Sequence, residues 1–231
     1  MKGLSQLEKT TGIKFKNKDL LIQAITHRSY LNEHPEFKLD HNERLEFLGD
    51  AVLELVVTEY LYKHYSNPEG ELTNWRASLV NGANLAKIAQ LIGLEPFIMM
   101  SRGEKKDTNT KARQYILANA MEAIIGAIYL DQGIKEAKKF IDSHILGDLK
   151  QIIENKLYID PKSRFQEKAQ ELFGVTPSYK VLAASGPDHN KIFKVGVFIN
   201  AEMIAQGTGS SKQEAQVEAA RAALHKKKWN Q

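Results

Sequence analysis

The chain has 231 residues, enough for one large domain or two modest ones. It is 42% hydrophobic and 26% charged, which is ordinary for a globular protein, and its formal net charge is +4. Because it contains no cysteine, disulfides, zinc–thiolate sites and thiol nucleophiles are excluded.

The start of the chain shows no targeting segment. The sequence MKGLSQLEKTTGIKF lacks the apolar centre of a signal peptide. Nowhere does an uninterrupted apolar run approach the roughly 20 residues that a membrane-spanning helix needs. We therefore expect a cytoplasmic protein with no membrane partner.

Residues 1–150 have the apolar periodicity of helices and no convincing alternation typical of strands. The helical segments that this periodicity predicts are 19–30, 43–64, 72–92, 112–131 and 134–150. Turn-forming sequences separate them, among them NPEG at 67–70 and a polar run at 101–111. We expect one all-α domain over residues 1–150.

The segment 42–62 is apolar around most of its circumference, which predicts a buried helix. One face nevertheless carries an acidic stripe. Its members are Glu43, Glu46, Asp50 and Glu54. Buried carboxylates are costly unless a positive charge offsets them, and no Lys or Arg follows Glu46 or Asp50 by four residues. The stripe is therefore either a solvated edge with ordinary ion pairs or a site for a hard cation such as Mg²⁺.

Two further features favour the metal interpretation. Gly49 lies among the acids, although glycine inside a helix costs about 1 kcal/mol relative to alanine, and this predicts a close approach by another backbone. The second feature is the apolar segment 115–131, in which Asn119 and Glu122 are three residues apart and share a helical face. An oxygen-rich Mg²⁺ site supports phosphodiester hydrolysis, whereas no G-x-S-x-G, P-loop or H-E-x-x-H motif is present.

Two other groups of residues have simpler interpretations. His27, in THRSY, has no metal-ligand spacing and is expected to be a hydrogen-bonded structural residue. The apolar residues 97–100 are expected in the core, with a subunit interface as the alternative.

The last third of the chain differs in both pattern and charge. Residues 160–231 hold 11 Lys and Arg against 7 Asp and Glu, whereas residues 1–159 are neutral. This excess indicates either a handle for a polyanion or simple solubility. A helix over 161–173 precedes strand-like segments, and an Ala-rich helix with an N-terminal Ser cap follows them. The expected order is α-β-β-β-α, which makes this unit a smaller α+β domain.

The segment HNERLEFLGDAVLELVV, residues 41–57, closely resembles the signature of the ribonuclease III family. FKNKDLLIQAITHRSY, EGELTNWRASLVN and ILANAMEAIIGAIYLD match other blocks of that family in order. GPDHNKIFKV and GTGSSKQEAQVEAA resemble markers of its double-stranded RNA-binding domain. The resemblance covers nearly the whole chain and implies an all-α endonuclease domain at 1–150, a linker at 151–159 and an RNA-binding domain at 160–231.

This resemblance implies a homodimeric, Mg²⁺-dependent endonuclease for double-stranded RNA that leaves short 3′ overhangs and serves in ribosomal and messenger RNA processing. Mn²⁺ is a plausible substitute for Mg²⁺. The implied metal ligands are Glu46, Asp50, Asn119 and Glu122, and Asp50 and Glu122 are the implied catalytic residues. Glu43 and Glu69 are expected to support the metal site or the subunit contact.

Position 119 departs from the family pattern, which has Asp there. The amide removes one negative charge, so we expect normal RNA binding and slow or absent cleavage. The favoured origin is a substitution introduced to trap an RNA complex, because the rest of the match is intact. A naturally weakened variant and an amide that acts indirectly on the ligands remain alternatives. A non-catalytic RNA-binding protein is the second functional hypothesis, whereas the RNA-binding unit disfavours an all-α phosphohydrolase for small nucleotides.

The resemblance also implies which residues contact RNA. A-form RNA is read across two minor grooves and the phosphates between them. The implied contacts are Ser163, Gln166 and Glu167 on the first helix, Pro187 and His189 in a loop, and Ser210, Ser211 and Lys212 at the start of the last helix. The family usually has more lysines there, and Gln213 and Gln216 occupy two of those positions. We expect a weaker and less salt-dependent phosphate contact.

Overall fold

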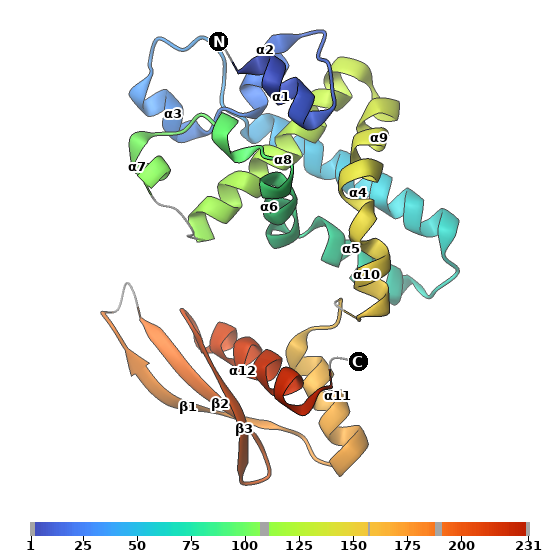
Figure 1. Ribbon diagram of the computed structural model, residues 1–231, viewed down its shortest axis with the longest axis vertical. Helices are drawn as coiled ribbons and strands as arrows, with labels where there is room; N and C mark the ends of the chain where they lie inside the picture. Colours follow the sequence, from blue (N-terminus) through green and yellow to red (C-terminus); the bar gives the residue numbers. More distant parts are fainter. Residues whose placement is uncertain (1–2, 107–110, 157, 188–190, 230–231) are drawn as a thin grey trace. The chain divides into compact units, whose positions relative to one another are not determined.

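The computed structural model describes residues 3–106, 111–156, 158–187 and 191–229. It divides into two compact units, Met1–Ile152 and Ile153–Gln231 (Figure 1). The first is helical, and the second contains a helix, three antiparallel strands and a final helix. The predicted fold class is confirmed. A helix, α10, covers Leu149–Glu154 at the start of the expected linker, which stays a prediction.

The first unit is built around two long helices, α4 (Glu43–His64) and α8 (Lys111–Gln132). The others surround them: α1 (Leu4–Thr11), α2 (Lys18–Ala24), α3 (Arg28–Glu33), α5 (Glu69–Val80), α6 (Gly82–Leu91), η1 (Glu95–Phe97), α7 (Arg102–Lys106), α9 (Ile134–His144) and η2 (Leu146–Asp148). α8 is buried along most of its length, which accounts for its apolar composition. These two helices form the centre of the unit.

The expected helix at 19–30 was wrong in its continuity. It is divided into α2 and α3, because the chain between them pairs with a distant segment: the Met99 N–H donates to the Ile25 carbonyl, and the His27 N–H donates to the Met99 carbonyl. The His27 ring nitrogen then caps α3 by accepting from the Ser29 N–H, so its structural interpretation is confirmed.

The expected helix at 72–92 is also divided. Asn81 lies between α5 and α6, where its extended backbone ends the first helix and its side chain caps the second by accepting from the Asn84 N–H. Within residues 97–100, Ile98 and Met100 are buried, in agreement with the core interpretation.

The second unit packs two helices against one face of its sheet (Figure 1). Its elements are α11 (Pro161–Phe173), β1 (Ser178–Ser185), β2 (Ile192–Ile199), β3 (Glu202–Gly209) and α12 (Lys212–Lys227). The strands are antiparallel in the order β1-β2-β3. Phe165, Val197 and Ala219 join both helices and the sheet in one core. Pro161 occupies the first helical turn, where the Asp160 carboxylate accepts backbone N–H groups.

Within the residues that the structure describes, no helix is both long and apolar enough to cross a bilayer.

Candidate metal site and RNA-binding face

The candidate metal site lies where α4 crosses α8 at close range. A Cβ atom added to Gly49 would lie 1.8 Å from the Glu122 carbonyl oxygen, and one added to Gly126 would lie 2.3 Å from the Leu45 carbonyl oxygen. No real side chain tolerates such distances, so both positions require glycine. The close approach predicted from Gly49 is confirmed, and Gly126, four residues after Glu122, is a second helix glycine from which it could have been predicted.

The crossing brings carboxylates from the two helices together. Burial raises the pKa of Glu122, and the charges of Asp50 and Glu46 add to this effect, so that the pKa reaches about 7. Burial also raises the pKa of Glu46, with a smaller contribution from Glu43. Such mutual repulsion requires that the acids lie close to one another. The structure therefore gathers Glu46, Asp50 and Glu122 at one crossing.

Asn119 belongs to the same cluster through its amide. The Asn119 side chain lies near enough to Glu46 to oppose the upward shift in the pKa of that carboxyl. Of the two side chains only the Asn119 amide can donate a hydrogen bond to an ionised carboxylate. The second carboxylate oxygen of Glu46, Oε2, is buried and has no hydrogen-bond partner. An aspartate at position 119 has no N–H group with which to make this contact.

No Lys, Arg or His among the described residues forms an ion pair with Glu46, Asp50 or Glu122. Nor do three or more Asp, Glu, His or Cys side chains of the described ranges form an arrangement that could hold a metal ion by itself. Mg²⁺ is usually held by one or two carboxylates, several waters and substrate phosphates, so it does not need a full protein cage. The orphaned buried Glu46 oxygen and the anionic donor set fit a hard divalent cation.

Glu43 lies at the edge of this cluster and has partners of its own. Its carboxylate lies 3.5 Å from an Arg28 nitrogen and 3.8 Å from the His41 Nδ1. Both contacts involve exposed or half-exposed side chains, so they contribute little to stability. Glu43 is near enough to Glu46 to raise the pKa of that carboxyl, as a supporting acid would.

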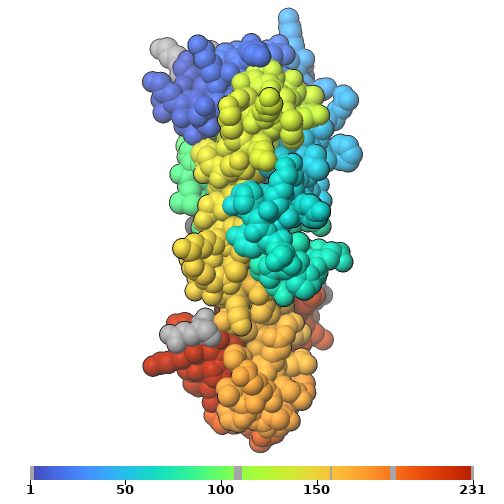
Figure 2. Space-filling model, turned by 90° about the vertical axis from the view of Figure 1, so that its right-hand side faces the viewer, coloured from blue at the N-terminus to red at the C-terminus, as the bar shows by residue number. Residues whose placement is uncertain are grey.

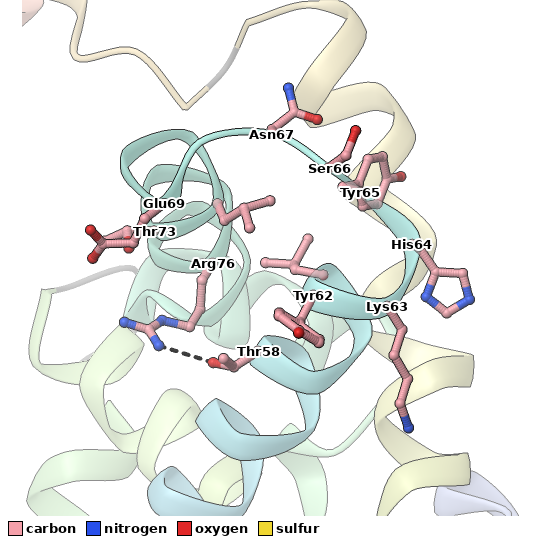
Figure 3. Close-up of a pocket in the computed structure, with 12 residues that line it drawn as sticks. Thr58, Tyr62, Lys63, His64, Tyr65, Ser66, Asn67, Glu69, Thr73 and Arg76 are labelled. Atoms are coloured by element: carbon pink, nitrogen blue, oxygen red, sulfur yellow. Dashed lines mark hydrogen bonds between the residues drawn. The ribbon is translucent and has the colours of Figure 1, made fainter.

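Glu69 is placed differently. It lines a groove of about 960 Å³ between the end of α4 and the start of α5, together with Thr58, Tyr62 and Arg76 (Figure 3). Arg76 spans the groove wall by donating to the Thr58 hydroxyl at 2.9 Å. Glu69 is not among the charges that shift the pKa of Glu46 or Glu122. Within one chain, the structure does not bring Glu69 to the acid cluster.

The outer face of α4 carries large apolar side chains, contrary to the expectation that this helix is buried. Phe47, Leu55 and Tyr62 are 82%, 62% and 80% exposed. They lie eight and seven residues apart, which places them along one side of the helix. In the space-filling view α4, in cyan, reaches the surface of the first unit beside the start of α5 (Figure 2). Among the described residues of the first unit, the core packs against the opposite side of α4 and leaves this side exposed.

In the second unit, α11 presents the expected polar face. Ser163, Gln166 and Glu167 are exposed, and with Gln170 and Glu171 they line a shallow hollow of about 570 Å³. These residues recur at helical spacing on one side of α11, whereas Phe165 faces the core. The arrangement offers hydrogen-bonding groups along one edge of the unit.

The start of α12 is closed by a cap. The Ser211 hydroxyl accepts from the Glu214 N–H at 3.1 Å, and the Glu214 carboxylate accepts from the Ser210 N–H and hydroxyl at 2.8 and 2.6 Å. Both serines therefore serve the cap, and Lys212 presents an exposed cation beside it. Pro187 is exposed after β1, and His189 lies outside the described residues.

Both parts of the chain match known families. Residues 17–149 match the ribonuclease-III-like family, and residues 161–227 match the double-stranded RNA binding motif. Ribonuclease 3 of Carboxydothermus hydrogenoformans is 45% identical over 96% of this chain and 94% of its own length. Ribonuclease 3 of Nitratiruptor sp. is 43% identical over 97% of this chain and 96% of its own length.

The nuclease domain of ribonuclease III from Campylobacter jejuni supplies the structural comparison. One crystal structure superposes with a TM-score of 0.55 at 43% identity and covers 64% of this chain and 97% of that domain. A second, which describes structural flexibility in a region involved in dimer formation, has a TM-score of 0.54 at 44% identity and covers 62% of this chain and 96% of its own. With both units matched and relatives alike over nearly the full length, the chain belongs to the ribonuclease III family.

Proposed function

We propose that the chain is an endonuclease for double-stranded RNA that works as a homodimer with a divalent metal, Mg²⁺ or in its place Mn²⁺. The observation that carries the proposal is the acid cluster at the α4–α8 crossing, in which Glu122 has a pKa of about 7 and no cation of the described chain offsets the charge. A double-stranded RNA binding motif on the same chain supplies the substrate class. Family membership supports a divalent metal without showing which one.

Each residue of the cluster has a role in the proposal. Glu46, Asp50, Asn119 and Glu122 would hold the metal, and Asp50 and Glu122 would be the catalytic residues. When bound, a divalent ion supplies charge that polarises a phosphodiester and activates water. The carboxylates would orient that water, and Glu122, ionised once an ion offsets its neighbours, would accept hydrogen bonds from it. Glu43 and Glu69 support the site or the subunit contact.

Asn119 weakens this site. An amide supplies no charge, and its nitrogen already interacts with Glu46. A ligand set with one fewer carboxylate binds a divalent cation less tightly, and the attacking water is held less well. The proposal is therefore a chain that binds duplex RNA normally and cleaves it slowly.

The outer side of α4 supports the dimer. Exposed apolar side chains of this size mark a protein contact, and Phe47 leads the row on α4. The groove beside Tyr62, at the far end of the same row, is lined in part by Leu61 and Leu72. An isologous contact in which α4 helices run antiparallel would set Phe47 of each subunit at the groove of the other. The dimer then carries two acid clusters, one for each RNA strand, and staggered cuts leave short 3′ overhangs.

A second candidate is a non-catalytic RNA-binding protein on the same scaffold, because the amide at position 119 fits both functions. One experiment separates the two: cleavage of an end-labelled duplex in Mg²⁺ by the chain and by Asn119→Asp, with binding measured in parallel without metal. The proposal expects equal affinities and cleavage at least tenfold faster for Asn119→Asp. Equal cleavage rates would contradict the impaired site, and no cleavage by either chain would favour the binding protein. A cytoplasmic location and a role in RNA processing remain part of the proposal.

A further inference from the structure

We propose that Lys162, at the start of α11, binds RNA phosphate and supplies the positive charge that α12 lacks at Gln216. The inference rests on the proposed RNA-binding role of the start of α12. Nothing in the local sequence points to this role, because Lys162 belongs to a different helix from Lys212. The two helices contact each other within the second unit.

The position of the ammonium group carries the inference. Lys162 Nζ donates to Gln216 Oε1 at 2.7 Å. Gln216 follows Lys212 by four residues, so both lie on the same face of α12. The Lys162 charge therefore lies one helical turn along from Lys212, where a lysine at 216 would otherwise place its own charge. Cations one turn apart on a helix can follow an RNA backbone.

The partners of Lys162 leave its charge intact. Gln216 provides a neutral oxygen, and an ammonium group has three donors, so donors remain for a phosphate. The second contact is the Tyr179 ring, whose centroid lies 5.2 Å from Nζ. Burial, followed by the charge of Asp160, raises the pKa of Tyr179 to about 12, so the ring stays neutral. The two contacts fix the ammonium in place without neutralising it.

Nearby carboxylates are occupied elsewhere. Asp160 accepts from the Lys162 and Ser163 backbone N–H groups at 3.0 and 3.1 Å, and thereby caps α11. Glu214 is engaged with Ser210 in the cap of α12. Among the described residues, Lys162 forms no ion pair. The positive potential along this edge is therefore available to a polyanion.

A purely structural role predicts something different. If Lys162 only ties α11 to α12, its loss lowers stability and weakens RNA binding by the same factor at every salt concentration. A phosphate contact instead contributes to counterion release, which makes the loss of affinity largest at low salt. The dependence of affinity on salt therefore distinguishes the two roles.

The test uses the full chain and a duplex of about 20 base pairs, longer than the roughly 16 base pairs that such a domain spans. Binding is measured without divalent metal at several KCl concentrations, and the thermal unfolding midpoint is recorded for every variant. Lys162→Gln keeps an amide able to bond Gln216. We expect it to reduce the slope of log K against log salt by about 0.7 to 0.9, the contribution of one phosphate.

Two matched variants sharpen the test. The double variant Lys162→Gln with Gln216→Lys exchanges the charged and the amide partner of the hydrogen bond between the two helices. We expect the slope of log K against log salt to return to that of the parent chain. Lys168→Gln removes a lysine that pairs with Glu171 at 2.7 Å on another side of α11, and we expect no change in slope.

The outcomes separate this inference from the function on which it rests. An unchanged slope for Lys162→Gln, with a reduced slope for Lys212→Gln, overturns the inference and leaves the RNA-binding face in place. Unchanged slopes for both variants overturn both. A salt-independent loss of affinity with a lowered unfolding midpoint assigns Lys162 a structural role only and also overturns the inference.

Discussion

In the first unit, the charges of the proposed site are carboxylates on the facing sides of α4 and α8. In the second unit, the charges proposed to bind RNA are lysines at the starts of α11 and α12. Glu46 and Glu122 pay for their position with raised pKa values, because burial and neighbouring carboxylates disfavour the ionised form. Lys162 is half-buried and Lys212 is exposed. The comparison supports the proposal that the acid cluster holds a small cation, whereas Lys162 and Lys212 suit a regular row of phosphates.

The acid cluster depends on the close crossing of α4 and α8. Gly49→Ala should disrupt this crossing and have the largest effect on stability. A methyl group 1.8 Å from the Glu122 carbonyl forces the two helices apart. We expect a loss of about 3 kcal/mol in the free energy of unfolding of the first unit, at the upper end for overpacked sites. Urea denaturation followed by circular dichroism measures it.

Gly70→Ala is the matched control, since an added Cβ at Gly70 on α5 has no atom within 4 Å. It should be neutral or slightly stabilising, because alanine favours the helix. Equal losses for both variants would show that the crossing is not the cause.

The exposed side of α4 forms the subunit contact of the proposed dimer. Phe47→Asp should weaken self-association by roughly 3 kcal/mol, because the dimer loses two such side chains at about 1.5 kcal/mol each, which is about 150-fold in the dissociation constant. Sedimentation velocity over a concentration series measures this. Leu91→Asp on α6 replaces a side chain that is 73% exposed away from α4 and should leave the dimer unchanged. A parent chain that is monomeric at all concentrations would refute the contact.

The raised pKa of Glu122 predicts a smaller effect on stability. Below pH 4.5 the carboxyl is protonated in both folded and unfolded chains, and as the pH rises through about 7 the folded state loses the proton and the associated stability. In metal-free buffer, Glu122→Gln should therefore raise the unfolding midpoint by a few degrees at pH 8 and leave it unchanged at pH 4.5. A pH-independent difference would contradict the electrostatic explanation.

Local sequence patterns predicted the second unit well and the first in part. Alternation in β2 and the Ser-capped Ala-rich α12 depend on near neighbours, and both formed as expected. The break between α2 and α3 depends on Met99, more than 70 residues away, which no local period contains. Phe47 shows a different limit. The sequence pattern of an apolar residue is the same whether its own chain or a partner subunit covers it. No apolar periodicity in the sequence predicted α1, although its Leu7 is buried in the core.

In the candidate site, too, features that depend on near neighbours were predicted and those that depend on distant residues were not. Spacing alone placed Glu46 and Asp50 on one face of a helix, but only the structure shows that Glu122 lies beside them and that Glu69 does not within one chain. Gly126, like Gly49, is a glycine inside a helix, but the sequence does not show that the Leu45 backbone of another helix is what requires it. Lys162 was missed because its partner Gln216 is 54 residues away.

The most direct measurement of the central claim is the thermal unfolding midpoint of the first unit with and without Mg²⁺ at pH 8. A ligand that binds only the folded state raises that midpoint. If α4 and α8 jointly present oxygens that a small dication offsets, Mg²⁺ should stabilise the parent chain, and this increment should disappear in Glu122→Gln. An equal increment in both chains, or none in the parent, would contradict the account.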